Sequence, residues 1–237
     1  MSVRVLVTTS VIAERDAVLA GLPAGAALVT GPDPEPPPST GPDITVGTVG
    51  VGPAAAAART ARLLGLAEAA GRPYQVVISA GIAGGFPDRA PIGATVLARR
   101  SVHADLGAES PDGWQSLDQL GFGSTVLTVD PSVLAALTAA LPEAVLGDVL
   151  TVTTVTGTAE RAATLAARHP EAVAEGMEGY GVGCAAADAG VRYGELRTIS
   201  NPVGPRDRAA WRIGEALDAL TAAASALTRL VSLADAG

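Results

Sequence analysis

Short runs rich in Val, Ile and Thr alternate with Ala-rich segments of helical spacing along most of this 237-residue chain. The runs typical of strands cover residues 3–8, 44–49, 75–79, 93–103, 149–155 and 194–199. The segments typical of helices cover residues 12–22, 53–70, 131–141, 158–167, 177–189 and 207–234. Alternating strands and helices form a mainly parallel sheet covered on both faces. The sequence therefore predicts a single three-layer α/β/α domain over residues 1–237, with a central, mixed and twisted sheet.

Two segments interrupt this alternation. Residues 31–42 are rich in proline and are predicted to form a loop, which is too short to link two domains. Residues 105–122 hold Pro, Gly, Trp114 and several polar side chains, which predicts a surface excursion able to form one wall of a pocket.

The composition argues against several classes of protein. Apolar residues make up 48% of the chain and aromatic residues only 3%, so the predicted core consists of Ala, Val, Leu and Ile. A net charge of −8 without a basic cluster argues against a nucleic-acid surface. The apolar runs are too short for a signal peptide or for the roughly 20 residues of a membrane span. The single cysteine, Cys184, excludes an internal disulfide and a multi-cysteine metal site, and fits a cytoplasmic protein.

Two stretches carry polar residues suited to binding a sugar and a base. Glu175 and Glu178 flank Met177 at the predicted start of a helix, and Asn201 ends a predicted strand. A carboxylate accepts hydrogen bonds from ribose hydroxyls, whereas an amide both donates and accepts along the edge of a base. The alternative for Glu178 is local, since negative charge in the first turn of a helix interacts favourably with the helix dipole.

Other residues near the ends of predicted strands also have two interpretations. Glu14 is either a site carboxylate or a charge at a helix terminus. The glycine-rich run 81–85 either lets a ligand approach the backbone or forms a tight turn with positive φ, and it matches neither the dinucleotide motif nor the P-loop. His103 closes a strand and is a candidate to line the site, whereas His169 is expected at a helix terminus and Cys184 in the core.

Four segments, in their order and spacing, resemble the purine nucleosidase and nucleoside phosphorylase superfamily over nearly the whole chain. They are Ala80-Gly-Ile-Ala-Gly-Gly85, Thr156-Gly-Thr158, Met177-Glu178 and Ile199-Ser-Asn201. The chain is most similar to nucleosidases that act on methylthioadenosine and, among them, to the futalosine hydrolases of menaquinone biosynthesis. The resemblance implies a nucleoside phosphorylase-like fold, a small-molecule nucleoside substrate, a homo-oligomer such as a dimer or tetramer, and no metal or organic cofactor.

The same resemblance implies roles for individual residues. Glu14 positions or deprotonates the attacking water, Glu178 binds the ribose hydroxyls, and Asn201 stabilises the departing base. The residues implied to bind the substrate are Gly81, Ile82, Glu160, Arg161 and Met177. Glu14 departs from the family pattern, because the usual Met-Glu-Glu-Glu-like run is here Val11-Ile-Ala-Glu14.

Asn201 is a second departure, and it concerns the base. The methylthioadenosine enzymes resembled here carry Asp at this position, whose proton can serve N7 of adenine while the carboxyl group accepts from the amino group. Hypoxanthine presents two acceptors on that edge, O6 and N7, as guanine does. An amide NH2 can donate to such an edge. Asn201 therefore favours a 6-oxopurine, and similar nucleosidases with Asn at this position act on futalosine.

The predicted nucleophile is water. Phosphate needs a cationic or N–H-lined pocket, and neither residues 10–13 nor residues 80–85 include an arginine. Arg99 and Arg100, on the following strand, leave phosphorolysis open. We therefore expect hydrolysis of futalosine to hypoxanthine and dehypoxanthine futalosine. The alternatives are a 6-oxopurine nucleoside phosphorylase, a methylthioadenosine-type nucleosidase and a non-catalytic nucleoside-binding module.

The benzoate arm of futalosine requires a cation. Arg206 and Arg208 follow Asn201 closely in the sequence and are the candidates. The alternative is that both are solvated charges at the start of the last helix.

Overall fold

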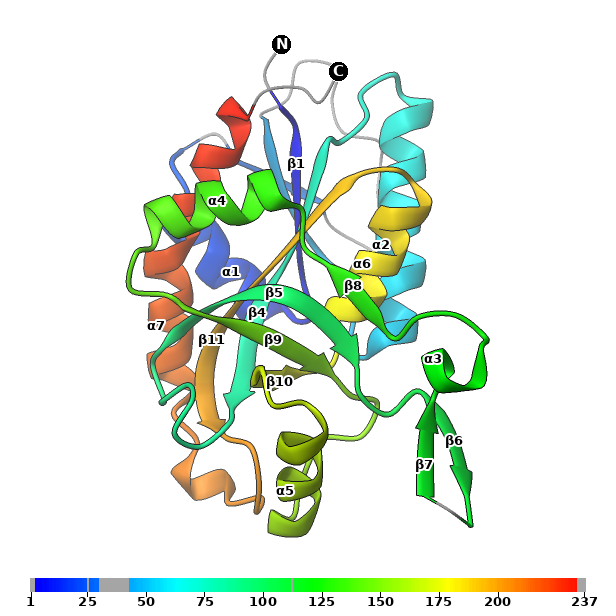
Figure 1. The fold of residues 1–237 in the computed structure, drawn as a ribbon. Helices are drawn as coiled ribbons and strands as arrows, with labels where there is room; N and C mark the ends of the chain where they lie inside the picture. Colours follow the sequence, from blue (N-terminus) through cyan, green and yellow to red (C-terminus); the bar gives the residue numbers. More distant parts are fainter. Residues whose placement is uncertain (1–2, 25, 30–42, 112, 234–237) are drawn as a thin grey trace.

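The computed structural model describes residues 3–24, 26–29, 43–111 and 113–233. Within them a mixed sheet runs in the order β10-β9-β5-β11-β4-β1-β3-β2, with β8 beside β5 (Figure 1). Its strands are β1 (Val5–Thr9), β2 (Ala27–Val29), β3 (Ile44–Thr48), β4 (Val76–Gly85), β5 (Thr95–His103), β8 (Val126–Thr128), β9 (Val145–Thr151), β10 (Ala172–Gly176) and β11 (Arg192–Pro202). The α-helices are α1 (Ile12–Gly21), α2 (Pro53–Ala69), α3 (Leu117–Leu120), α4 (Pro131–Ala140), α5 (Ala159–Arg168), α6 (Gly179–Asp188) and α7 (Ile213–Ala224). Two 3-10 helices are η1 (Arg208–Ala210) and η2 (Ser225–Ser232).

Helices cover both faces of the sheet, which confirms the predicted α/β/α layers. Successive side chains of a strand point to opposite faces, and β1 shows this clearly. Val5 and Val7 pack in the apolar cluster under α1, α4 and α7, whereas Leu6 packs in the cluster under α2 and α6. Figure 1 shows these two groups of helices on opposite sides of the strands.

The sheet curls back on itself. β4 pairs with β1 along its first half and, through Gly84 and Gly85, with β10 in antiparallel fashion. Strands β4, β11, β5, β9 and β10 thereby form a closed ring. Gly84 pairs with Glu175 of β10 on one side and with Asn201 of β11 on the other. Ring closure thus brings the two polar stretches found in the sequence to either side of the glycine-rich run.

The glycine-rich run is part of β4 rather than a turn. Gly81, Gly84 and Gly85 do not have positive φ, so the turn interpretation was wrong. They are needed because neighbours come too close for a side chain. A Cβ on Gly85 would lie 2.1 Å from the carbonyl oxygen of Ala90, and one on Gly81 would lie 2.6 Å from Oε1 of Glu14.

Other differences from the predicted elements are local. β9 begins and ends four residues before the predicted strand, and the last helix is divided into η1, α7 and η2. The short strands β2 and β10 were not predicted, because both are alanine-containing and alanine is depleted in strands. The proline-rich residues 31–42 lie outside the described part of the chain.

The excursion at residues 105–122 forms the hairpin β6 (Gly107–Ser110) and β7 (Gly113–Ser116), followed by α3. It projects from the body of the molecule (Figure 1). With Arg168, whose guanidinium lies 4.0 Å from the centre of the Trp114 ring, it borders a separate cavity. In the described part of the chain it does not line the cavity that holds Glu14, Glu178 and Asn201.

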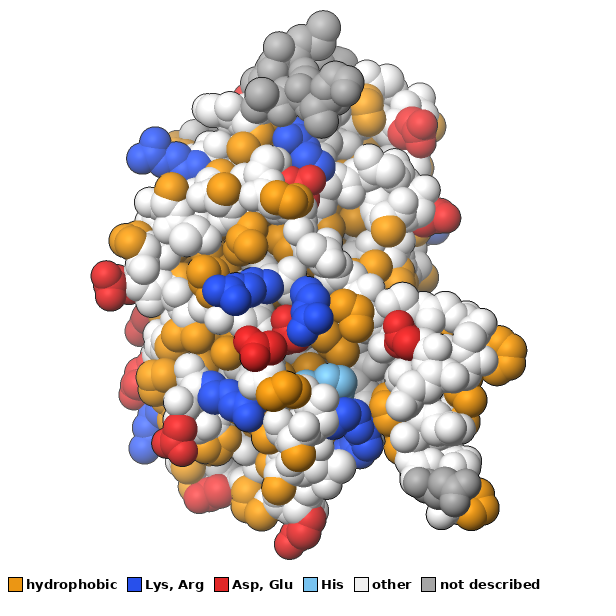
Figure 2. Space-filling view, viewed as in Figure 1, with side chains coloured by type: hydrophobic (Ala, Val, Ile, Leu, Met, Phe, Trp, Pro, Cys, Tyr) orange, Lys and Arg blue, Asp and Glu red, His pale blue; other side chains and the backbone are white. Residues whose placement is uncertain are grey.

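Acidic and basic side chains are intermixed on the face shown in Figure 2. No helix among the described residues is long and apolar enough to cross a membrane.

Candidate active site

A cavity of about 340 Å³ opens at the carboxyl ends of β1, β4, β10 and β11. This is where open α/β sheets bind ligands. The residues that line it are Ser10, Val11, Glu14, Val51, Ile82, Ala83, Gly84, Val155, Thr156, Glu175, Gly176, Met177, Glu178, Ser200, Asn201, Val203 and Trp211. The lining is mostly apolar with a few convergent polar groups, as is usual for a small-molecule site.

Glu14 is held by donors from two elements. Its Oε2 accepts hydrogen bonds from the Ser10 N–H at 2.9 Å and the Ser10 hydroxyl at 2.5 Å, at the start of α1. Its Oε1 accepts from the Ile82 N–H of β4 at 2.9 Å. The two interpretations of Glu14 are therefore compatible, because one oxygen serves the helix terminus while the carboxylate as a whole lines the cavity.

Glu178 precedes α6 but does not cap it, since its side chain makes no hydrogen bond to the helix. Its Oε1 accepts from the Gly52 N–H at 3.1 Å, and its Oε2 lies 3.7 Å from Nη1 of Arg197. Burial raises the pKa of Glu178 above its ordinary value, although Arg197 and the Gly52 N–H oppose the shift. The purely local interpretation of Glu178 does not account for these contacts.

Arg197 is the main site residue that sequence reasoning missed. It is fully buried on β11, where its Nε donates to Oε1 of Glu195 at 2.9 Å and its Nη2 donates to the Ser79 hydroxyl at 2.9 Å. A Cβ on Gly81 would lie 2.9 Å from its Nη1 and 2.6 Å from Oε1 of Glu14, so the cation and that carboxylate approach each other over Gly81. Burial by itself lowers the pKa of Arg197, but the surrounding carboxylates raise it above its usual value.

Asn201 presents a donor to the cavity. Its Oδ1 accepts from the Ser200 hydroxyl at 2.8 Å, and its Nδ2 donates to the carbonyl of Pro202 at 3.0 Å. These two bonds assign the orientation of the amide. An NH2 group has two N–H donors, and among the described residues the second donor of Asn201 has no protein acceptor. It is therefore available to a ligand.

Glu175 has a structural role at the same cavity. It is buried, and its two oxygens accept from the Thr156 N–H at 2.9 Å and the Thr156 hydroxyl at 2.5 Å. Burial raises the pKa of Glu175, and the two bonds from Thr156 oppose the shift. Glu175 thus fixes the loop between β9 and α5, one wall of the cavity.

The structure brings most of the remaining predicted residues to this site, but not all. Ile82 and Met177 line the cavity, and Gly81 lies beneath the carboxylate of Glu14. Glu160 and Arg161 do not line it, because both lie in the first turn of α5 beyond the Thr158 cap.

Arg208 also lies outside the lining, but it neighbours a residue that belongs to it. The guanidinium carbons of Arg206 and Arg208 lie 5.8 and 5.9 Å from the centre of the Trp211 ring. Trp211 itself lines the cavity.

Three further candidates lie elsewhere. His103 contacts the ring of Tyr180, with centroids 5.2 Å apart, and is absent from the lining. His169, which was expected at a helix terminus, is the C-cap residue of α5 and borders the separate cavity near Trp114. Arg99 and Arg100 are exposed on β5, and Arg100 pairs with Asp148. The cation of this site is therefore Arg197 rather than either arginine of β5.

The arrangement is a buried guanidinium with carboxylates on either side, next to an amide donor. The charged groups in such a site are largely shielded from solvent, so the electrostatic interactions between them are stronger than in water. It can bind hydroxyl groups, orient and deprotonate a small nucleophile, and stabilise negative charge that develops on an acceptor near Asn201.

The chain is similar to proteins of a known family. A family model described as the phosphorylase superfamily matches residues 25–234. The chain is 52% identical over 228 residues to the futalosine hydrolase of Streptomyces coelicolor, with 94% of each chain covered. It is 49% identical over 237 residues to the futalosine hydrolase of Acidothermus cellulolyticus, covering 96% of this chain and 91% of that relative. Among solved structures, a 5′-methylthioadenosine/S-adenosylhomocysteine nucleosidase from Colwellia psychrerythraea in complex with adenine has the same fold, with a TM-score of 0.77 at 19% identity over 98% of this chain and 95% of that chain.

Proposed function

The chain belongs to the phosphorylase superfamily, and from this premise we propose that it hydrolyses the N-glycosidic bond of futalosine, a step of menaquinone biosynthesis. The products are hypoxanthine and dehypoxanthine futalosine. The observation that carries the proposal is the convergence of Glu14, Glu178 and Asn201 on one cavity. The relatives from Streptomyces and Acidothermus, both named futalosine hydrolases, indicate which nucleoside enters it.

Glu178 binds the ribose in this proposal. One of its oxygens is held by the Gly52 N–H and the other faces Arg197, but a carboxylate has about four acceptor positions. The unused positions accept the ribose hydroxyls, and Met177 packs against the sugar. As the bond to the base breaks, positive charge develops on the ribose ring, and the fixed carboxylate stabilises it.

Glu14 activates the attacking water. Hydrogen bonds from Ser10 and Ile82 fix the orientation of the carboxylate, so the water molecule that gives up its proton to Glu14 is held in one place.

The balance of charge also favours water over phosphate as the nucleophile. Arg197 is surrounded by Glu14, Glu178 and Glu195, and a phosphate dianion that approached this cation would meet an excess of negative charge.

Asn201 reads the base. Its second N–H donates to O6 or N7 of hypoxanthine, both of which are acceptors. The same donor strengthens its bond as the leaving base gains electron density, which stabilises the transition state.

Replacing Asn201 with Asp is expected to shift base preference towards 6-aminopurines. A protonated carboxyl group donates to N7 and accepts from the amino group, which an amide does less well. We expect the ratio of kcat/KM for adenosine over inosine to rise by about tenfold to hundredfold, measured as release of each base in parallel. An unchanged ratio would show that Asn201 does not contact the base edge.

The benzoate arm of futalosine is proposed to meet Arg208, with Arg206 beside it. Both guanidinium groups lie close to Trp211, which lines the cavity. Both arginines are exposed, so the interaction is partly screened by solvent.

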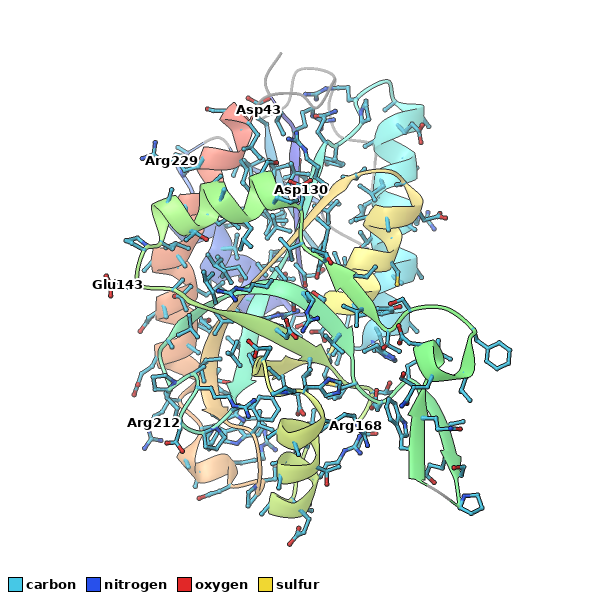
Figure 3. All side chains as sticks on the ribbon, viewed as in Figure 1. Asp43, Asp130, Glu143, Arg168, Arg212 and Arg229 are labelled. Carbon is cyan, nitrogen blue, oxygen red and sulfur yellow. The ribbon has the colours of Figure 1, made fainter. Side chains whose placement is uncertain are left out.

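Replacing Arg208 with Ala tests this. We expect the KM for futalosine to rise roughly three- to tenfold while the KM for inosine, which lacks the benzoate arm, stays the same. Arg229→Ala is the matched control, since Arg229 is an exposed arginine of η2 at the opposite end of α7 (Figure 3). An equal rise for both nucleosides would place Arg208 away from the benzoate.

We also propose a cytoplasmic homo-oligomer. Val11, Val51 and Val155 line the cavity and are exposed. The exposed Ile12 follows Val11, and the exposed Ile213 lies two residues after Trp211, which also lines the cavity. Exposed apolar side chains gathered in this way mark an interaction surface, and a second copy of the chain would cover it.

Release of hypoxanthine from futalosine by the purified protein tests the proposed reaction. Inosine and methylthioadenosine are assayed in parallel, first in phosphate-free buffer and then with phosphate added. Release from futalosine that is indifferent to phosphate is the expected result. Release that requires phosphate would instead establish a phosphorylase, and release only from methylthioadenosine would assign a different nucleosidase.

A further inference from the structure

Glu195 is a fully buried carboxylate that does not line the cavity, yet it is bonded to the cation of the site. It lies two residues before Arg197 on β11, so both side chains project from the same face of the strand. Its Oε1 accepts from Nε of Arg197 at 2.9 Å. Its Oε2 accepts from the Tyr193 hydroxyl at 3.1 Å and from the Ser101 hydroxyl of β5. A buried charge in this position is costly unless it is paired and hydrogen-bonded, and here it is both.

We propose that Glu195 is a positioning residue that orients the Arg197 guanidinium between Glu14 and Glu178 and neutralises enough of its charge for the site to admit water and exclude phosphate. This inference rests on the proposed hydrolysis of futalosine.

The orientation follows from the two anchors of the guanidinium. This group is planar and rigid, so two fixed donors determine where the third nitrogen lies. Nε is fixed by Glu195 and Nη2 by the Ser79 hydroxyl of β4. Nη1 is thereby turned towards Oε2 of Glu178 at 3.7 Å and towards Glu14 over Gly81.

Glu195 also determines the residue that follows Glu178. A Cβ on Gly179 would lie 2.2–2.4 Å from the Glu195 carboxylate, which excludes a side chain there. The one proton of the Tyr193 hydroxyl is shared between Oε2 of Glu195 and the carbonyl of Gly179, which lies 2.8 Å from the hydroxyl oxygen. The same buried group therefore supports Arg197 and the backbone that carries Glu178.

The charged and titratable groups around Glu195 come from three elements. β11 contributes Arg197 and the Tyr193 phenol, α1 contributes Glu14, and the turn before α6 contributes Glu178. The other polar neighbours, the hydroxyls of Ser101 and Ser79, are neutral. One cation thus interacts with three carboxylates. Burial and then Glu195 hold the pKa of Tyr193 well above its ordinary value, so the phenol stays neutral.

Glu195→Gln removes the charge and keeps the shape. The amide oxygen can still accept from Nε of Arg197, but the remaining carboxylates lose a negative neighbour and gain a larger share of the Arg197 field. A carboxylate that is closer to net positive surroundings is harder to protonate, and in this variant those carboxylates are Glu14 and Glu178. We expect the acid limb of the kcat/KM profile for futalosine to move to lower pH by roughly one unit, and inorganic phosphate to become a competitive inhibitor.

Asp148→Asn is the matched control. Asp148 is a buried carboxylate in an ion pair with Arg100, and it borders the separate cavity near Trp114 rather than this one. Its variant should keep the wild-type pH profile and remain insensitive to phosphate. If Glu195→Gln only scales the rate, with an unshifted acid limb and no inhibition by phosphate, then Glu195 merely stabilises the fold and the assignment is overturned.

Glu195→Asp covers the case in which the Gln variant does not fold, as judged by thermal melting. It keeps the charge but is one methylene shorter, so it should lower kcat by about tenfold without moving the acid limb. A wild-type kcat in this variant would overturn the assignment. The wild-type enzyme is assayed first without phosphate, so that failure of the proposed function appears as absence of turnover before any variant is compared.

Discussion

Replacing Glu178 with Gln is expected to lower futalosine turnover by about 10³-fold while the protein remains folded. The substitution keeps the size of the side chain and an oxygen that can accept from the Gly52 N–H. It removes the negative charge that faces Arg197 and that stabilises the positively charged ribose of the transition state. KM should rise as well, because the ribose hydroxyls lose an acceptor.

Although the variant loses activity, its thermal stability relative to wild type should increase as the pH rises. The pKa of Glu178 is raised on folding, chiefly by burial. A carboxyl group with a raised folded pKa favours the native state at low pH and loses that contribution as the pH rises through the folded value. Gln has no ionised form, so the melting temperature of Glu178→Gln relative to wild type should increase from about pH 4, near the ordinary pKa of glutamate, to about pH 8.

The matched control for this substitution is Glu143→Gln. Glu143 is exposed in the loop before β9 and projects from the edge of the molecule (Figure 3). Its variant should keep the wild-type rate and the wild-type pH dependence of melting. A near-normal rate in Glu178→Gln would remove Glu178 from the mechanism, whatever its effect on stability.

The fold could be predicted from the sequence because its signals are local. The Val-rich run that became β1 and the Ala-rich segment that became α2 each carry the periodicity of their element. β10 could not be predicted in the same way. It is a short segment with two alanines, and it becomes a strand only because β4 and β9 pair with it on either side. That pairing joins residues far apart in the sequence, which no local pattern records.

The residues of the candidate site also differ in whether a local pattern in the sequence points to them. Glu14 and Glu178 lie at the starts of helices and Asn201 lies at the carboxyl end of β11, so the general rule for α/β ligand sites points to them. Arg197 lies inside a strand and escaped that rule. A signal for it was present, since Glu195 and Arg197 have opposite charges at positions i and i+2 of the predicted strand 194–199. Such residues share one face of a strand, and in a buried strand they are expected to pair.

The residues that the structure does not bring to the cavity show the limit of a resemblance. Glu160 and Arg161, which the resemblance implied to bind the substrate, lie in the first turn of α5, and this loop lines the cavity through Val155 and Thr156 instead. The loop is drawn in by Glu175, whose carboxylate binds both the backbone and the hydroxyl of Thr156. A single anchoring residue, here Glu175, thus decides which part of the loop faces the cavity. A match between sequence motifs does not take such an anchor into account.

Glu14→Gln should have the largest effect of all, a fall in kcat of about 10³- to 10⁴-fold, because a general base cannot be replaced by a neutral amide. Its KM should change little, since Glu14 contacts neither the ribose nor the base in the proposed mechanism. This separates it from Glu178→Gln, in which both constants change. The measurement is the kcat and KM of hypoxanthine release across pH in phosphate-free buffer.

Ser10→Ala provides a graded comparison for that result. It removes the hydroxyl that donates to Oε2 of Glu14 at 2.5 Å but leaves the carboxylate and the Ser10 N–H in place. A fall in kcat of about tenfold is expected, since the base is still present but less firmly oriented. If Glu14→Gln lost no more activity than Ser10→Ala, Glu14 would only support the start of α1, and water would have to be activated by another carboxylate near Arg197. A large loss in the first variant and a small one in the second would instead tie the rate to the charge of Glu14, because both substitutions alter the contact between residues 10 and 14 and only one removes the base.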